Sequence, residues 1–160
     1  MAIQIEMEDE SRIDAWMALA ERVKAVFPGL ETAEAMEAHR RAALGFMRRA
    51  SAICALDGER IVGGLLFSKE QNMLCFLAVD AAYRRQGVAR RMVERMLPLM
   101  DGEKDVVVTT YREGAPEGAA ARAFYARLGV VPGRLMEEFG SPVQEFVMKR
   151  QGGELQGQSL

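Results

Sequence analysis

The chain has 160 residues, a formal net charge of −2 and 49% hydrophobic residues. This length suits one domain, which can bury about two thirds of the surface of its unfolded chain. The balanced charge argues against a surface built as a whole for nucleic acid or an anionic membrane, although it permits a local basic patch. The sequence shows no signal-peptide pattern and no apolar run near the roughly 20 residues that cross a bilayer, so we expect a cytoplasmic protein.

The cysteines and the single histidine carry no metal or nucleophile motif. Cys54 and Cys75 each lie in an apolar stretch and lack the close C-x-x-C spacing of a zinc or redox site. We interpret both as reduced core residues, and we predict no metal site. His39 has no G-x-S-x-G motif to accompany it, so a Ser-His-Asp triad is not expected and we place His39 on a helix surface.

The expected elements follow the hydrophobic periodicity along the chain. Alternation at Ile3, Ile5 and Met7 predicts a first strand, and helical spacing predicts helices over about residues 11–27 and 33–49. The remaining expected elements are strands over 52–56, 61–67 and 73–79, a helix over 87–100, a strand over 105–111, a helix over 118–128, and strands over 133–139 and 144–150. The strand over 73–79 is apolar on both faces, which predicts a place at the centre of the sheet.

This order of elements, β-α-α-β-β-β-α-β-α-β-β, predicts the fold class. It indicates one α/β (α+β) domain over residues 1–150, with a mixed sheet and helices on its faces. Residues 151–160 are polar and rich in Gly and Gln, so we expect a flexible C-terminal tail.

The segment from Leu77 to Arg91 carries the most chemical information. It joins a buried strand to a helix through a loop with the pattern Arg84-x-x-Gly87-x-Ala89. A helix N-terminus offers unpaired N–H groups and the positive end of the helix dipole, and glycine lets a phosphate approach the backbone closely. Further positive charge comes from the arginines of this segment, Arg84, Arg85, Arg90 and Arg91.

The predicted ligand of this loop is a diphosphate. The chain lacks the Walker A pattern and the Rossmann G-x-G-x-x-G pattern, so ATP and NAD are poor candidates. The alternative is that the arginines form only a solvated helix face.

A second segment, Ala121-x-x-x-Tyr125-x-x-x-Gly129, is a helix that ends at a glycine. Together with Leu77-x-Val79 and Arg84-x-x-Gly87-x-Ala89, it resembles the GCN5-related N-acetyltransferase (GNAT) family over about residues 3–149. The resemblance implies a single GNAT-like domain with a central mixed, mostly antiparallel sheet of about seven strands, flanked by about four helices. It also implies an acyltransferase that moves the acetyl group of acetyl-CoA directly to an amine.

The resemblance also implies which residues bind the donor. In the family, the strand matching Leu77 to Val79 splays from its neighbour and pairs with the pantetheine arm, and the following loop holds the pyrophosphate. The implied donor-binding residues are Leu77, Ala78, Val79, Arg84, Arg85, Gln86, Gly87, Val88, Ala89 and Arg90. Tyr125 matches the acid that protonates the leaving thiolate, and its alternative role is that of a core aromatic. A fixed N–H near Val79 is the natural donor to an oxyanion.

The chain departs from the family pattern at three places. Gly118 stands where many members have an Asn that bonds the pantetheine, and Val130 replaces an aromatic residue. The strand over 73–79 has no acidic residue, so the general base is unassigned. The available carboxylates are Asp80, Glu113, Glu137 and Glu138, each more simply explained as a surface charge.

The acceptor is expected to be a small-molecule or peptide amine that the sequence does not identify. Thr110, Arg112 and Glu113 follow a strand next to the donor strand and are our acceptor-site candidates, with a plain strand terminus as the alternative. Methionines at helical spacing, Met36 among them, are interpreted as core. We expect no nucleic acid or membrane partner, and the sequence is compatible with a homodimer.

Two other functions stay open. A catalytically degenerate CoA-binding sensor would explain the missing Glu and Asn. A nucleic-acid-binding module would use the arginine cluster and predicts binding that weakens with salt.

Overall fold

The computed structural model describes residues 2–26, 30–111, 119–138, 141–151 and 154–155. The strands of the main sheet are β1 (Gln4–Met7), β2 (Ala52–Asp57), β3 (Arg60–Ser68), β4 (Met73–Val79), β5 (Val106–Tyr111), β6 (Val130–Glu138) and β7 (Ser141–Met148). The helices are α1 (Ile13–Val23), α2 (Ala33–Arg48), α3 (Val88–Met96) and α4 (Ala119–Arg127). Short 3-10 turns are η1 (Glu10–Arg12), η2 (Lys24–Val26), η3 (Ala81–Tyr83) and η4 (Leu97–Leu99).

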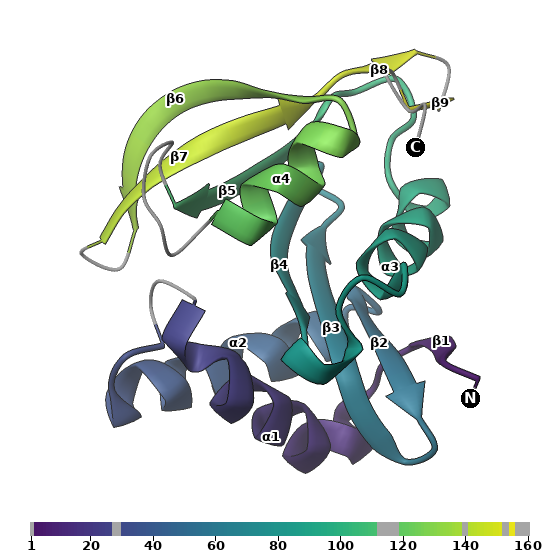
Figure 1. Cartoon of the computed structure of the whole chain (residues 1–160), viewed down its shortest axis with the longest axis vertical. Helices are drawn as coiled ribbons and strands as arrows, with labels where there is room; N and C mark the ends of the chain where they lie inside the picture. The colour runs from purple at the N-terminus through teal and green to yellow at the C-terminus, as the bar shows by residue number, and fades with distance from the viewer. Residues whose placement is uncertain (1, 27–29, 112–118, 139–140, 152–153, 156–160) are drawn as a thin grey trace.

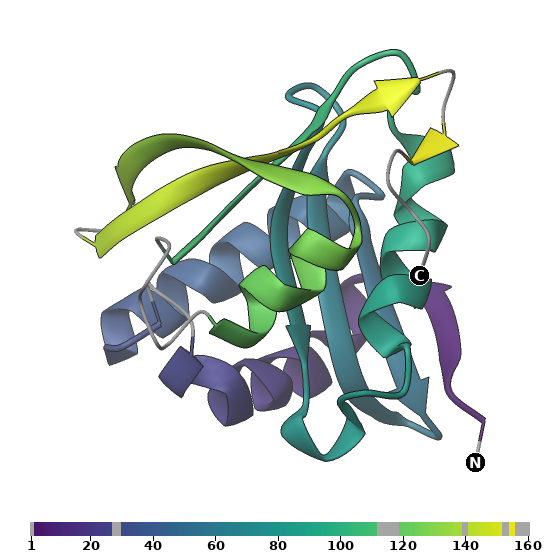
Figure 2. The same cartoon turned by 45° about the horizontal axis from the view of Figure 1, so that its top comes forward.

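The main sheet has seven strands in the order β1-β2-β3-β4-β5-β7-β6. Every neighbouring pair is antiparallel except β4 and β5, which are parallel. Helices α1 and α2 cover one face, and α3 and α4 cover the other (Figures 1 and 2). The expected fold class, order of elements and central position of β4 are therefore confirmed.

Several element boundaries differ from the expected ones for local reasons. Asp9 caps η1 by accepting the N–H of Ser11, so α1 starts later than expected, at Ile13. Helix α3 ends at Met96 because Pro98 lies in the following 3-10 turn and cannot donate to an α-helical ladder. In the tail, β8 (Arg150–Gln151) pairs with β9 (Glu154–Leu155), and the domain boundary near residue 150 stays a prediction.

Two hydrophobic clusters fill the space on either side of the sheet. The cluster beneath α1 and α2 includes the buried Trp16, Leu19, Ala43 and Cys54. The larger cluster joins the other sheet face to α3 and α4. Cys54 is a free thiol and fully buried as expected, whereas Cys75 is only partly buried.

Gly64 on β3 lets α1 approach the sheet. A Cβ at this position would lie 2.7 Å from two ring carbons of Trp16, which has no exposed surface. Such a contact forces the indole to move.

We therefore expect Gly64→Ala to lower the free energy of unfolding by about 1–3 kcal/mol, measured by urea denaturation. Gly45→Ala on α2 is the control, because its Cβ meets only the flexible end of Arg49, at 3.3 Å, and alanine favours the helix. Equal stability of the Gly64→Ala variant and the wild type would contradict this packing.

No helix in the part of the chain that the structure describes is long and apolar enough to cross a membrane.

Candidate functional site

The sheet opens between its two parallel strands. Only Met73 and Leu74 of β4 pair with β5, opposite Val107 and Val108. From Leu77 to Val79 the side of β4 that faces β5 pairs with no strand among the described residues, and Figure 1 shows β5 diverging from β4 together with β6 and β7. The backbone N–H and C=O groups of Leu77 to Val79 on this side of β4 are therefore available to a ligand.

A β-bulge marks the point of divergence. Across from β4, Leu66 faces Phe76 and the next residue, Phe67, faces Leu74, so Cys75 is the extra residue. A bulge bends its strand and increases the local twist. The bulge therefore directly follows Leu74, the last residue of β4 that pairs with β5.

Asn72 connects the start of β4 to the segment before β5, at the end of the two strands where they still pair. Its side-chain amide donates to the carbonyls of Asp101, Lys104 and Asp105 at 3.3, 3.1 and 3.1 Å, and its Oδ1 accepts the Asp101 N–H at 2.9 Å. The residue is buried and has a φ of +49°, which asparagine tolerates better than most residues. Asn72 was missed in the sequence because it ends a run of polar residues, Ser68 to Asn72, that has the pattern of an ordinary turn before a strand.

We expect Asn72→Ala to lower the free energy of unfolding by about 2–4 kcal/mol, because it removes these bonds and strains the backbone. The exposed Gln71, of which only the backbone N–H is bonded, provides the control variant Gln71→Ala. Matching urea midpoints for the two variants would show that Asn72 does not hold the strands together.

The loop after β4 leads into the start of α3. Gly87 is the N-cap residue of α3, with a φ of +77° and no side-chain cap, and Arg85 also has a positive φ of 64°. The N–H groups of Val88, Ala89 and Arg90 precede the first helical bond, from Arg91 N–H to the Gly87 carbonyl at 3.0 Å. Uncapped N–H groups at a helix N-terminus bind anions.

The side chains around this helix start leave the backbone accessible. A Cβ added at Gly87 would meet nothing within 4 Å, so its positive φ, rather than crowding, is what requires glycine. Arg84, Arg85 and Gln86 are exposed, whereas Val88 is buried in the core and can contribute only its N–H.

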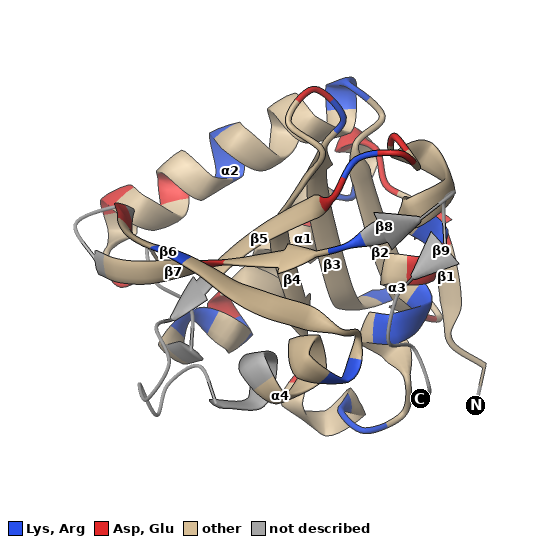
Figure 3. Ribbon diagram, turned by 90° about the horizontal axis from the view of Figure 1, so that it is seen from above, with Lys and Arg blue, Asp and Glu red and all other residues tan. Residues whose placement is uncertain are grey.

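Positive charge gathers beside the loop. Figure 3 shows Lys and Arg positions along α3. Arg90 pairs with Glu94 at 3.3 Å, and Arg84, Arg85 and Arg91 have no ion-pair partner among the described residues. Unpaired guanidinium groups beside uncapped N–H groups favour a ligand with several phosphate oxygens.

Asp80, the first residue after β4, anchors this loop. It caps η3 by accepting the Ala82 N–H at 3.0 Å, and it pairs with Arg22 of α1 at 2.8 Å and Arg60 of β3 at 3.4 Å. Arg22 also donates to the Ile61 carbonyl at 2.8 Å. Asp80 is 7% exposed, so its interpretation as a surface charge is wrong, and it holds the loop to the helix on the other face of the sheet.

The charge state of Asp80 depends on these partners. Burial raises the pKa of this carboxyl, but the Ala82 N–H and the two guanidinium groups lower it more, so the net pKa is below its ordinary value of 3.8. A carboxyl with a depressed pKa in the folded state adds stability above its ordinary pKa and loses it as the pH falls through the folded value.

We expect Asp80→Asn to destabilise the fold by about 1–3 kcal/mol at pH 7, because the guanidinium groups of Arg22 and Arg60 lose their negatively charged partner. The difference from wild type should start to shrink as the pH falls below the ordinary pKa of 3.8 and disappear below the lower pKa of Asp80 in the folded protein. Urea denaturation of both proteins between pH 7 and pH 3 measures this, and a difference that does not change with pH would rule out the ionic role.

Tyr125 lies on α4 and is 5% exposed. It belongs to the same cluster as Leu77 and Val79 of β4, so the structure brings the expected acid and the open strand to one face of the sheet. Burial raises the pKa of the phenol above its ordinary value of 10. The phenol is therefore protonated at neutral pH and is not a base, while its raised pKa makes transfer of the proton to a thiolate less favourable than from an ordinary tyrosine.

His39 is not a surface residue, contrary to the sequence analysis. Its Nε2 accepts the Trp16 indole N–H at 3.0 Å, and its ring lies 4.8 Å from that of Phe76 on β4. Burial lowers the pKa of His39 to about 4, so the ring is neutral at pH 7. Because the indole occupies its acceptor nitrogen, His39 does not supply the missing base.

The remaining candidates are only partly covered by the structure. Thr110 lies near the end of β5, in the half of the strand that does not pair with β4, and its side chain lies outside the described part of the structure. Arg112 and Glu113, like Gly118, lie outside the described residues. Of the carboxylates considered as a base, Asp80 is held by arginines and Glu137 is exposed on β6.

Comparison with known proteins agrees with this geometry. The model of the acetyltransferase (GNAT) family matches residues 16–130. The chain therefore belongs to the GNAT family, and it is an acyltransferase of the acetyl-CoA-dependent class. No curated protein matches the sequence.

Solved structures of this family share the fold at low sequence identity. A GNAT-family acetyltransferase from Bacillus cereus ATCC 10987 is 13% identical with a TM-score of 0.72, covering 94% of this chain and 99% of that one. PaiA N-acetyltransferase from Thermoplasma acidophilum, in complex with coenzyme A, is 16% identical with a TM-score of 0.64, covering 91% and 98%. The ribosomal-protein-S18-alanine N-acetyltransferase of Escherichia coli is 15% identical with a TM-score of 0.66, covering 91% of each chain.

Proposed function

We propose that this protein transfers the acetyl group of acetyl-CoA directly to a primary amine. One observation carries the proposal: the stretch of β4 from Leu77 to Val79, which does not pair with β5, leads within one short loop to the uncapped start of α3 at Gly87. The first feature suits an amide-containing arm and the second a diphosphate. Coenzyme A carries both groups in one molecule, and the PaiA structure is a complex with coenzyme A.

Each part of coenzyme A is then assigned to a set of residues in this site. Backbone groups of Leu77, Ala78 and Val79 pair with the pantetheine arm. The N–H groups from Gly87 to Arg90 bind the pyrophosphate, with Arg84, Arg85 and Gln86 around it. Because backbone atoms make most of these contacts, side-chain changes at Leu77 or Val79 should have smaller effects than changes to the loop conformation.

The chemistry requires two proton movements. A primary amine with a pKa near 10.4 is almost wholly protonated at pH 7, so it must lose a proton before it attacks the thioester carbon. The C–N bond forms first, an N–H near Val79 stabilises the resulting oxyanion, and the C–S bond breaks when this intermediate collapses. Tyr125 then protonates the CoA thiolate, which leaves an acetamide and free CoA as products.

The proposal is tested by thermal unfolding with acetyl-CoA, CoA, ATP, NAD and an oligonucleotide, followed by acetylation assays on a panel of amines. Acetyl-CoA at 100 times its dissociation constant should stabilise the fold by about 2.7 kcal/mol. Stabilisation by the oligonucleotide alone would support a nucleic-acid-binding module instead. Stabilisation by acetyl-CoA without acetylation of any amine would favour a degenerate CoA-binding module, as the glycine at position 118 suggests.

A cytoplasmic location, a homodimer and acceptor contacts by Thr110, Arg112 and Glu113 stay predictions.

A further inference from the structure

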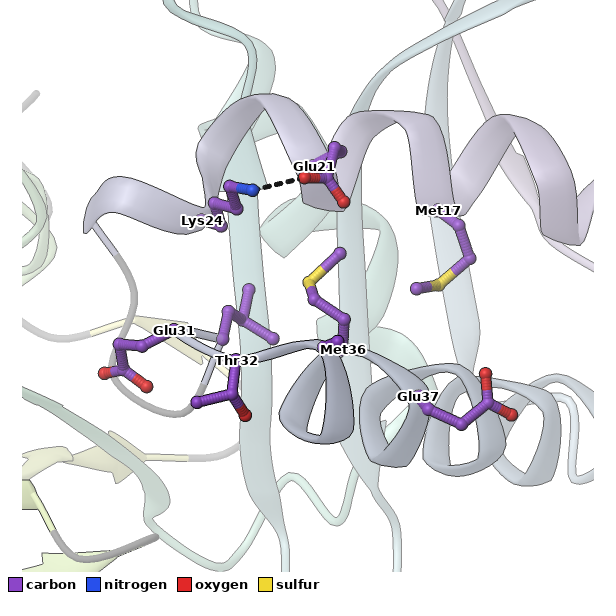
Figure 4. Close-up of a pocket in the computed structure, with 9 residues that line it drawn as sticks. Met17, Glu21, Lys24, Glu31, Thr32, Met36 and Glu37 are labelled. Atoms are coloured by element: carbon purple, nitrogen blue, oxygen red, sulfur yellow. Dashed lines mark hydrogen bonds and ion pairs between the residues drawn. The ribbon is translucent and has the colours of Figure 1, made fainter.

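A cavity lies between α1 and the beginning of α2, with a volume of about 340 Å³. Figure 4 shows the side chains of Met17 and Met36 extending toward each other across the space between the helices. Met36 is half-buried and lines this cavity, so its assignment to the core from sequence periodicity was wrong. The acidic residues of the lining all have partners, and they are Glu21, Glu31 and Glu37. Within the described part of the chain, the cavity therefore offers a ligand no unpaired acidic group.

The donor loop, residues 80–87 between β4 and α3, has a conformation that its exposed side chains do not explain. Arg85 has a φ of 64° and Gly87 a φ of 77°. A residue other than glycine keeps a positive φ only where its surroundings hold it there. The side chains of Arg84, Arg85 and Gln86 are exposed and do not supply such a restraint. The restraint therefore comes from the loop residues before them.

The turn between β2 and β3 holds this earlier part of the loop. Its two flanking residues, Asp57 and Arg60, face each other across the hairpin. Tyr83 donates its hydroxyl proton to Oδ2 of Asp57 at 2.5 Å, and Arg60 pairs with Asp80 at 3.4 Å. One turn is thus joined to the donor loop at two points.

Of these two contacts, the bond between Tyr83 and Asp57 is the one without a substitute. Asp80 is also held by Arg22 at 2.8 Å, so it keeps a partner without Arg60, whose side chain is 56% exposed. The Tyr83 hydroxyl has no second hydrogen-bond partner among the described residues. Tyr83 and Asp57 are both half-buried, and Tyr83 also packs against the core cluster beneath α3 and α4. A hydrogen bond to a carboxylate is stronger than one between neutral groups.

The charge of Asp57 makes its role distinguishable by the sign of its effect. A carboxylate repels a diphosphate, so Asp57 does not suit direct contact with the donor. If Asp57 acted only through its charge, its removal would tighten binding. If it acts by holding Tyr83, its removal weakens binding.

We propose that Tyr83 and Asp57 are positioning residues of the donor site. Their hydrogen bond holds the donor loop in the conformation that presents the N–H groups of Val88 to Arg90 to the diphosphate of acetyl-CoA. The inference rests on the proposed function and adds two residues that do not touch the donor. Because the bond only positions the loop, its loss weakens binding by a limited factor and does not abolish it.

Titration calorimetry of the full chain with acetyl-CoA tests this inference. We expect Tyr83→Phe and Asp57→Ala each to raise Kd about three- to tenfold. The double variant should have a Kd no higher than that of the more affected single variant, because both changes remove the same bond. Asp57→Asn keeps an oxygen that accepts from Tyr83, so its Kd should stay closer to that of the wild type.

Ser51→Ala is the control, because it removes a hydrogen bond at the other end of β2. The Ser51 hydroxyl donates to the Arg49 carbonyl at 3.2 Å, and the loss of this bond should leave Kd unchanged.

Four results would each overturn the inference: tighter binding by Asp57→Ala, an unchanged Kd in Tyr83→Phe, additive effects in the double variant, or equal weakening by Ser51→Ala. Any of these in a wild-type protein that binds acetyl-CoA rejects the inference alone. If the wild type does not bind acetyl-CoA, the proposed function fails and this inference fails with it.

Discussion

Replacing Tyr125 by phenylalanine is expected to lower kcat for acetyl transfer by about 10²–10⁴-fold, the usual contribution of a positioned general acid. The KM for acetyl-CoA should change little, because the proposed contacts to the donor are mainly backbone groups of β4 and α3. The phenol is buried and its pKa is raised, so it remains protonated at neutral pH and can donate to the thiolate.

The stability of this variant separates chemistry from packing. Phenylalanine keeps the buried ring of Tyr125, so the thermal midpoint should remain near that of the wild type. Phe124→Leu, which changes the adjacent ring at a centroid distance of 5.4 Å, should cost stability but leave kcat within a few fold. Full turnover in Tyr125→Phe would mean that Tyr125 is only a core aromatic and that the thiolate takes its proton from water.

Gly87→Glu is expected to abolish binding of acetyl-CoA. A glutamate there places a carboxylate beside the N–H groups of Val88 to Arg90, where it repels a diphosphate and competes for the same donors. It also strains a backbone with a φ of +77°. The thermal stabilisation by acetyl-CoA that we expect of the wild type should therefore be lost.

Gly58→Glu is the matched control for this change. Gly58, in the turn between β2 and β3, also has a positive φ, of 64°, and a Cβ there would meet nothing within 4 Å. The two variants thus share the added charge and the backbone strain but differ in position. Retained binding in Gly87→Glu, or equal loss in both variants, would argue against a donor site at the start of α3.

The fold followed from the sequence because its elements have strong local signals. Alternation and helical spacing together predicted the main strands and helices of the observed fold. Local patterns did not predict the features that depend on contacts between residues far apart in the chain. Nothing in the segment over 73–79 indicates that Cys75 forms a bulge, because that depends on the register with β3.

In the candidate site, too, the local features were predicted from the sequence and the long-range contacts were not. The motif at Arg84 to Ala89 predicted where α3 would start, because the glycine and the helix beginning are local features. The anchoring of the loop by Asp80 was missed, since its partners Arg22 and Arg60 are 58 and 20 residues away in the chain. His39 was misplaced for a related reason: its periodicity is that of a half-exposed helix position, and only the packing of α2 against Trp16 buries it.

The most direct test of the donor site is backbone amide NMR of the protein titrated with acetyl-CoA. We predict that the largest chemical-shift changes fall on Leu77 to Val79 and on Gly87 to Arg90, with smaller changes along α1 and α2. Saturable binding with its largest changes confined to other elements would contradict the placement of the donor between β4 and β5 and at the start of α3.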